Sequence, residues 1–292
     1  MTDTLSQFSV LSLYSAMGVY AIAFVLFTIE LASKATEGKL SAKFPRMAMA
    51  LTWIAFVLQL AATIMRGLAA SRVPWANMYE FSMTGTLIIV AVFLFTNLKW
   101  NLRFLGAFIT GLVLILLGLA ATRYYVEIVP LPPALQSYWL VIHVFVATLA
   151  TGFFALGFGL SLLQLMQQRR ETAIAGDKKT RLGSLVRLPD AVALENYAYR
   201  LIIIGFIFWT FTLIAGAIWA DKAWGRYWGW DTKEVWTFII WTIYAGYIHA
   251  RATRGWRGTR SAILAMVGFG AVMFNFTIVN IFFKGLHAYS GL

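Results

Sequence analysis

The chain has 292 residues, of which 60% are hydrophobic and 12% are charged, with a mean hydropathy of +0.74. Soluble domains carry about 25% charged residues, so this composition excludes a soluble globular enzyme and a disordered chain. Cysteine is absent, which excludes a thiolate metal site and a thiol–disulfide relay within the chain. The net charge of +12 lies mainly between apolar segments, a pattern typical of membrane topology and not of a nucleic-acid partner.

Eight apolar segments are each long enough to cross a lipid bilayer as a helix. They cover residues 10–31, 47–70, 81–97, 103–120, 140–165, 200–220, 233–250 and 261–283. We therefore predict an all-α, polytopic membrane protein with about eight transmembrane helices, forming a single integral membrane domain over 1–292. The first residues, MTDTLSQFSV, lack a basic region, so a cleaved signal peptide is not expected.

The basic residues predict the orientation of these spans. Seventeen of the 24 Lys and Arg residues lie on one set of alternate connections, which the positive-inside rule places in the cytoplasm. Both termini then lie outside, and the polar connector 166–199 is a cytoplasmic loop. The opposite connections, at 72–81, 123–139 and 219–231, are rich in aromatic residues, Gly and Pro. We expect them to fold back onto the membrane face or to line a pocket there.

Three histidines are distributed between the two faces of the predicted bundle. His143 lies just inside the outer end of the fifth span and His287 follows the eighth, whereas His249 lies near the inner end of the seventh. Two histidines at one membrane level could ligate a haem iron from both sides. Zinc is a poorer fit, because it needs three or four protein ligands and the chain has no further His or Cys. His249 would need a second ligand from elsewhere, most simply from a partner chain.

Tryptophan is concentrated in the segment 219–241, WADKAWGRYWGWDTKEVWTFIIW. An interfacial belt of aromatic rings accounts for the two outermost tryptophans but not for the density between them. Gly225 and Gly229 would let the chain bend so that several rings face one surface, which suits a large, flat, conjugated ligand. The six tryptophans of this segment are Trp219, Trp224, Trp228, Trp230, Trp236 and Trp241.

Charged residues accompany these rings. Asp231 and Glu234 match the pattern of a helix start, with Asp231 as the N-cap and Glu234 reaching back to it. Lys222, Arg226 and Lys233 could pair with the carboxylates of an anionic ligand or with lipid phosphate. The sequence alone does not choose between these two roles.

The segment from WADKAWGRYWGWD to YIHAR resembles the WWD signature of the haem-handling membrane proteins of cytochrome c assembly. The likeness is greatest to the CcsA/ResC family of the system II route, and it extends over most of the chain. It implies an eight-span fold with the WWD loop outside, between spans six and seven. It also implies a multi-pass protein of the bacterial plasma membrane or the thylakoid membrane, with that loop on the periplasmic or lumenal side.

The resemblance carries over to particular residues. LQSYWLVIHV and GLHAYSG match the two external histidines of the family, so His143 and His287 take these roles, and His249 matches the histidine embedded in the membrane. PWANMYEF resembles a further family segment, in which Asn77 and Glu80 are candidate site residues, although a helix-start role also accounts for them. The other expected haem contacts are Trp219, Trp224, Trp228, Trp230, Trp236 and Arg226.

The resemblance implies a part in a complex that attaches haem b covalently to apocytochrome c. Haem would be received by His249 together with a histidine of a CcsB/ResB-type partner, and then held outside by His143 and His287. There its vinyl groups would meet the two thiols of a CXXCH motif. No side chain would act as a covalent catalyst, because the chain would work by positioning its reactants; Trp224, Trp228, Trp230 and Asp231 are the residues expected to orient the haem.

Two other functions remain open at this stage. A di-haem b-type cytochrome also needs histidines at two depths, but two bis-histidine haems need four and the chain has three. A transporter for an aromatic solute other than haem would also use an aromatic pocket. Haem content of the purified chain would separate these alternatives.

Overall fold

A computed structural model describes residues 2–32, 43–177, 183–283 and 285–287. Within these ranges the chain is entirely helical, with turns and loops between the helices. The long helices are α1 (Thr2–Ala32), α2 (Lys43–Ala70), α3 (Met78–Lys99), α4 (Gly106–Arg123), α5 (Tyr138–Ala175), α6 (Ala191–Trp224), α7 (Thr232–Thr253) and α8 (Thr259–Phe274). A π-helical turn, η5 (Asn275–Val279), and a last turn, α9 (Asn280–Phe282), continue α8. Short 3₁₀ turns are η2 (Arg103–Leu105), η3 (Pro133–Leu135) and η4 (Gly183–Arg187).

Seven of the described helical segments are long and apolar enough to cross a membrane. They are α1, α2, α3, α4 together with η2, α5, α6, and the stretch Thr259–Phe282. These segments confirm a polytopic, all-α membrane protein. The eighth predicted span corresponds to α7, which is a helix of 22 residues but is not among the seven. Its first turn carries Lys233 and Glu234 and its last turn carries Arg251, while Trp, Tyr, Thr and Gly fill much of its length.

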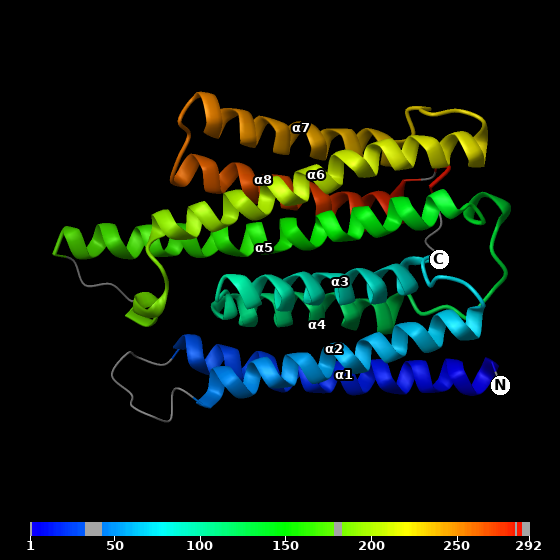
Figure 1. Ribbon diagram of the computed structural model, residues 1–292, viewed down its shortest axis with the longest axis horizontal. Coiled ribbons are helices and arrows are strands. Elements are labelled where there is room, and N and C mark those ends of the chain that lie inside the picture. Colours follow the sequence, from blue (N-terminus) through cyan, green and yellow to red (C-terminus); the bar gives the residue numbers. More distant parts are fainter. Residues whose placement is uncertain (1, 33–42, 178–182, 284, 288–292) are drawn as a thin grey trace.

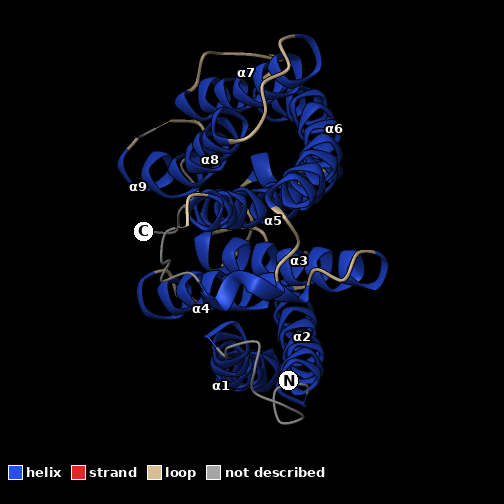
Figure 2. Ribbon diagram, turned by 90° about the vertical axis from the view of Figure 1, so that its left-hand side faces the viewer, coloured by secondary structure: helices blue, strands red, loops and turns tan. Residues whose placement is uncertain are grey.

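Helix α5 lies at the centre of the bundle (Figure 1). It packs along α6 and also contacts α3, α4 and α8. Viewed from the end, α5, α6, α7 and α8 form a ring, while α1 and α2 form a separate pair against α3 and α4 (Figure 2). The molecule is therefore a bundle in which a long central helix joins two groups of neighbours.

Small residues allow these helices to approach one another closely. On α2, Ala48, Ala55 and Ala62 recur every seven residues and are fully buried, and the Ala62 carbonyl accepts a hydrogen bond of 2.8 Å from Ser9 Oγ on α1. Between α5 and α6, a Cβ atom at Gly157 would come within 2.6 Å of the Ile202 side chain. Such contacts are typical of membrane helices. In lipid the hydrophobic effect does not drive helices together, so they associate through close backbone packing and dispersion.

The connections separate into two kinds at the two ends of the bundle (Figure 1). The α3–α4, α5–α6 and α7–α8 connections lie at one end, which we call the cation-rich end. The α2–α3, α4–α5 and α6–α7 connections lie at the other, the aromatic end, together with the start of α1 and the segment after α9. The structure thus brings together the three aromatic loops that the sequence places on one side.

A buried ion pair fixes the cation-rich end. The Arg251 guanidinium on α7 donates to the Glu195 carboxylate and to Asn196 Oδ1 on α6. The second Glu195 oxygen accepts the backbone N–H of Gly258, at the start of α8, at 3.0 Å. One carboxylate therefore ties three helices together, away from the aromatic end.

Two predicted boundaries need correction. The polar connector expected over 166–199 is mainly helical, because α5 continues to Ala175 and α6 begins at Ala191. Gln, Arg, Glu, Leu, Met and Ala fill the end of α5, and all of these residues favour helix in water as well as in lipid. Similarly, the connection expected over 219–231 is shorter, because α6 continues to Trp224 and only residues 225–231 lie outside a helix. Lys178 and the following residues to 182 lie outside the described ranges.

Candidate functional site

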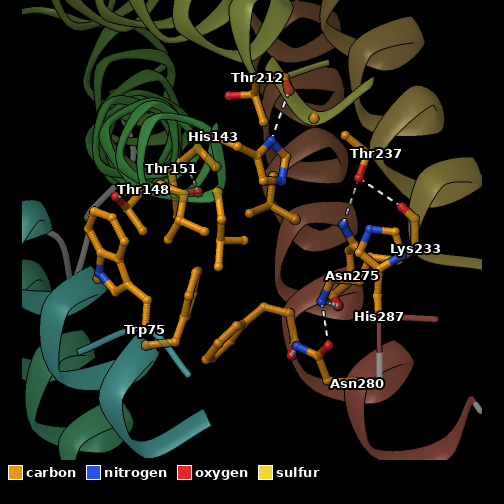
Figure 3. Close-up of a pocket in the computed structure, with 18 of the residues that line it drawn as sticks. Trp75, His143, Thr148, Thr151, Thr212, Lys233, Thr237, Asn275, Asn280 and His287 are labelled. Carbon is orange, nitrogen blue, oxygen red and sulfur yellow. Dashed lines mark hydrogen bonds between the residues drawn. The ribbon is translucent and has the colours of Figure 1, made fainter. Parts of the chain in front are cut away.

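A cavity of about 230 Å³ lies at the aromatic end of the bundle. Its walls come from α3, α5, α6, α7, the α8–α9 segment and the loop that precedes α3 (Figure 3). Trp75, Leu135 and Trp219 line it, one from each of the three aromatic segments. The expectation that these segments line a pocket is therefore confirmed.

His143 projects into this cavity from the first part of α5 (Figure 3). Its Nδ1 lies 3.0 Å from the backbone carbonyl oxygen of Thr212 on α6. A Cβ atom on Gly216 would lie 2.7 Å from His143 Cε1, so only glycine at that position lets the imidazole lie against the α6 backbone. The ring is also stacked against Trp219 at a centroid separation of 5.8 Å. One face of α6, which carries Thr212, Gly216 and Trp219, therefore packs against His143.

His287 lines the same cavity from the segment beyond α9. Its Nδ1 lies 3.1 Å from Asp231 Oδ1, and the second Asp231 oxygen accepts the Leu286 backbone N–H at 2.8 Å. The His287 hydrogen bond is the main reason that the pKa of Asp231 is lowered to about 2. The His287 ring meets Trp219 and Trp224 edge-on, at 5.3 and 4.8 Å. Asp231 therefore joins the start of α7 to the second histidine.

The two imidazoles share one arrangement of donors and acceptors. Both Nδ1 partners, the Thr212 carbonyl and the Asp231 carboxylate, are acceptors, so each Nδ1 carries the hydrogen and donates. The lone pair of each ring is then on Nε2, which is the arrangement that oxygen partners impose on metal-binding histidines. Trp219 contacts both rings. The pair could ligate a metal held by a flat aromatic macrocycle, and haem iron suits two neutral imidazoles.

The tryptophans of the 219–241 segment do not all face one surface. Trp219 and Trp224 lie with the two histidines, and Trp228 lines the cavity at its exposed rim. Trp230 is 78% exposed and contacts Trp228 edge-on. Trp236 packs instead against Phe274 on α8. Of these rings, Trp219 and Trp228 therefore line the cavity, and Trp224 packs against the His287 ring.

A tight turn at 225–231 separates the tryptophans near the two histidines from the exposed Trp230. Gly225 ends α6 in the left-handed conformation, with φ +70°, and Trp230 adopts φ +60°, a strained value for a residue with a side chain. The predicted capping box of α7 is present: the Asp231 side chain accepts the Lys233 N–H, and Glu234 Oε2 accepts the Asp231 N–H. Glu234 also accepts the Gly229 N–H at 2.8 Å. The helix start therefore fixes the turn and directs Trp230 outward.

Asn77 and Glu80 start α3. Asn77 lines the cavity, but its side chain accepts the Glu80 N–H as an N-cap. Glu80 is fully buried and does not line the cavity; its carboxylate binds both Arg66 of α2 and Arg72 of the following loop. The helix-start role is confirmed for Asn77, and Glu80 holds the α2–α3 connection in place.

His249 and Arg226 lie apart from the histidine pair. His249 is exposed near the last turn of α7, where its Nε2 lies 3.3 Å from Thr253 Oγ1. At 1.5 Å per residue, it lies roughly 24 Å along the helix from Lys233 at the cavity. The Arg226 guanidinium fills the space left by the missing side chain of Gly229 and lies 3.9 Å from Glu234.

Several cavity residues were not predicted from the sequence. Thr212 and Gly216 of α6 support His143, and Asn275 and Asn280 lie where the α8 helix passes through its π-helical turn. The spacing of Thr212 and Gly216 by one helical turn gave no signal, because Thr and Gly are common in membrane helices. Asn275 and Asn280 could have been predicted as site residues, because polar amides within an apolar span are unusual.

The fold and the site define a helical membrane protein with a histidine-lined cavity at one end. The family model described as "Cytochrome C assembly protein" matches residues 75–287, a range that contains every element lining the cavity. Cytochrome c biogenesis protein CcsA of Trieres chinensis is 34% identical over 255 residues, covering 78% of this chain and 81% of the relative. The chain belongs to the CcsA family of cytochrome c assembly proteins.

Further comparisons agree with this assignment. CcsA of Prochlorococcus marinus (strain NATL2A) is 32% identical over 297 residues, covering 94% of this chain and 93% of the relative. CcsA of Synechococcus elongatus is 35% identical and covers 77% and 81% of the two chains. Among solved structures, Cytochrome c Heme Lyase CcmF has a TM-score of 0.68 at 18% identity, covering 93% of this chain and 46% of CcmF. This last likeness shows that the fold is shared. Membership of the CcsA family gives the chain a role in cytochrome c biogenesis.

Proposed function

We propose that this protein holds haem b in the cavity at the aromatic end and presents it to apocytochrome c. The observation that carries the proposal is the pair His143 and His287, which flank Trp219 with both Nδ1 atoms anchored to oxygen acceptors. The two Nε2 atoms would hold the haem iron, and the rings of Trp219 and Trp228, which line the cavity, would supply an aromatic surface for the macrocycle.

The chemistry needs orientation more than a reactive side chain. Each cysteine thiol of a CXXCH motif adds across one haem vinyl group: the sulfur bonds to one vinyl carbon and the thiol hydrogen goes to the other. No external oxidant enters this balance. The protein would keep the iron coordinated and hold the vinyl edge where the two thiols reach it, which is catalysis by proximity. The absence of cysteine from this chain leaves the substrate thiols without a competitor.

The remaining parts of the proposal concern topology and partners. α7 would cross the membrane as the eighth span, because it runs beside α6 and α8 between the two ends of the bundle. The aromatic end would then face the periplasm or the lumen, and the cation-rich end the cytoplasm or stroma. His249, exposed on α7 near the cation-rich end, would receive haem together with a histidine of a CcsB/ResB-type partner.

The test is haem binding and holocytochrome c formation by single alanine variants. We expect His143→Ala and His287→Ala to lose the low-spin bis-histidine spectrum of the aromatic end and to form little holocytochrome c. Added imidazole, which can enter the space left by either ring, should restore part of both. His249→Ala is the control for the position of the site: it should leave that spectrum unchanged once haem is supplied to the purified protein. Normal spectra and normal holocytochrome c in both His143 and His287 variants would contradict the proposal.

A further inference from the structure

The cavity contains a partly buried lysine that forms no ion pair among the described residues. Lys233 comes from the first turn of α7 and lines the cavity with the two histidines. Its Nζ donates to the backbone carbonyl of Asn275 at 3.1 Å and to Asn280 Oδ1 at 2.5 Å. Both acceptors are neutral. Figure 3 shows Lys233, Asn275 and Asn280 together on the side of the cavity opposite Trp75.

The nearby acids and cations are committed elsewhere. Asp231 binds His287 and the start of α7. Glu234 also lines the cavity, but its Oε2 accepts the backbone N–H groups of Gly229 and Asp231 in the turn before α7. Lys222, the other lysine of this segment, is exposed and lies 3.6 Å from Asp221. Of the three cations near the tryptophans, Lys222, Arg226 and Lys233, only Lys233 lines the cavity.

The surrounding hydrogen bonds are incomplete as well. An ammonium group has three donors, and two of those on Lys233 are used. Asn275 is buried, and its Nδ2 lies 3.5 Å from Thr237 Oγ1, at the outer limit of a hydrogen bond. A partly buried cation beside a weakly bonded amide N–H is costly without a ligand. The third N–H of Lys233 and the Asn275 amide N–H are therefore available as donors at one place on the cavity wall.

We infer that Lys233, Asn275 and Asn280 form a carboxylate-binding subsite that receives a propionate of the haem. The inference rests on the proposed function and adds to it the direction in which the macrocycle enters. Haem carries both carboxylates on one edge and its vinyl groups on other edges. Holding a propionate at Lys233 therefore directs the vinyl edges away from α7 and α8, while the histidines bind the iron.

The probes are iron protoporphyrin IX and its dimethyl ester, which has the same iron and vinyl groups but no carboxylate. Both are titrated into the full-length purified protein, and binding is followed by the bis-histidine absorption spectrum. We expect wild type to bind the free acid about tenfold or more tightly than the ester, the size of one charge-assisted contact. Lys233→Met should lose this preference by weakening only the free acid, and Lys233→Arg should retain most of it.

Lys222→Met is the matched control, because it removes a cation of the same segment that lies outside the cavity; it should behave as wild type. Equal affinity of wild type for the acid and the ester would overturn the subsite and leave the histidine site standing. The same conclusion would follow if Lys233→Met weakened both porphyrins equally. Failure of wild type to bind either porphyrin would instead overturn the proposed function and the subsite together.

Discussion

At the scale of single residues, Asp231 has two roles that the sequence suggested only in part. It is the N-cap of α7, as the D-T-K-E pattern predicts, and it also accepts the hydrogen bond that orients His287. A carboxylate behind a metal-binding imidazole fixes the tautomer and makes the ring a stronger ligand. In the proposed haem site, Asp231 would act by orienting His287 without touching the haem.

We expect Asp231→Ala to weaken haem binding at the histidine pair by roughly 10–100-fold, the usual effect of losing such a partner. Capping is lost at the same time, so the control must lose a cap and nothing else. Asp190→Ala provides it, because Asp190 caps α6 through the Ala193 N–H at the cation-rich end. Haem titration and thermal unfolding of both variants are the measurements. Equal haem affinity in the two variants would show that Asp231 acts only as a cap.

The sequence could predict the two histidines of the site but not the groups that orient them. The two external histidines and their common level follow from the order of the apolar segments, and the structure places both on one cavity. The partners of their Nδ1 atoms could not be predicted, because the Thr212 carbonyl is 69 residues away and Asp231 is 56 residues away. Nothing local marks a backbone carbonyl as a partner.

At the scale of elements, the buried cluster around Glu80 fixes the first aromatic loop. One carboxylate binds Arg66 and Arg72, and also accepts the Ala76 backbone N–H. The Arg66 guanidinium lies over the ring of Tyr79 and donates to the Val126 carbonyl of the next connection. Two loops of the aromatic end are thereby tied to α2, and one of them carries Trp75 to the cavity.

Glu80→Gln should therefore lower stability strongly. Removing the charge leaves two guanidinium groups without their counter-ion, and breaking such buried pairs typically costs about 3–5 kcal/mol. Asp221→Asn is the matched control, because it breaks the exposed pair with Lys222 and should cost about 0–1 kcal/mol. Thermal unfolding in detergent compares the two. A midpoint for Glu80→Gln within a degree of the control would contradict the role of this cluster.

Element ends were harder to predict than element positions. All eight long helices overlap the eight apolar segments, because burial in lipid selects continuous apolar runs. The helices α5 and α6 extend beyond those apolar runs into polar sequence. A hydropathy pattern predicts a connector there, although the residues themselves favour helix. The π-helical turn after α8 also has no sequence signal of its own, since NFTIV could continue a regular helix.

At the scale of the whole molecule, the two ends of the bundle differ in chemistry. One end gathers basic connections around the Arg251–Glu195 pair, and the other gathers aromatic loops around a cavity. Charge patterning in the sequence was sufficient to sort the connections into these two sets, since the positive-inside signal depends on composition alone. It could not show that the aromatic loops converge, because that depends on how α5 sits among its neighbours.

The chain contains no cysteine, so single cysteines can report the side of each end directly. We expect Tyr227→Cys, in the exposed turn before α7, to react with a membrane-impermeant maleimide in intact cells. Trp256→Cys, in the exposed α7–α8 connection, should react only after the membrane is permeabilised. The cysteine-free wild type controls for background labelling. The reverse pattern would place the cavity on the cytoplasmic side and contradict the proposed presentation of haem.

The two histidines differ in how firmly the chain holds them. His143 belongs to the longest helix of the structure and lies against the α6 backbone at Gly216, whereas His287 lies in a turn held by one aspartate. A metal between them would have one stiff bond and one compliant bond. A third imidazole, arriving with a substrate, would replace the compliant one while the bundle stayed still. Under the proposed function, this asymmetry predicts that the bond from the metal to His287 exchanges before the bond to His143.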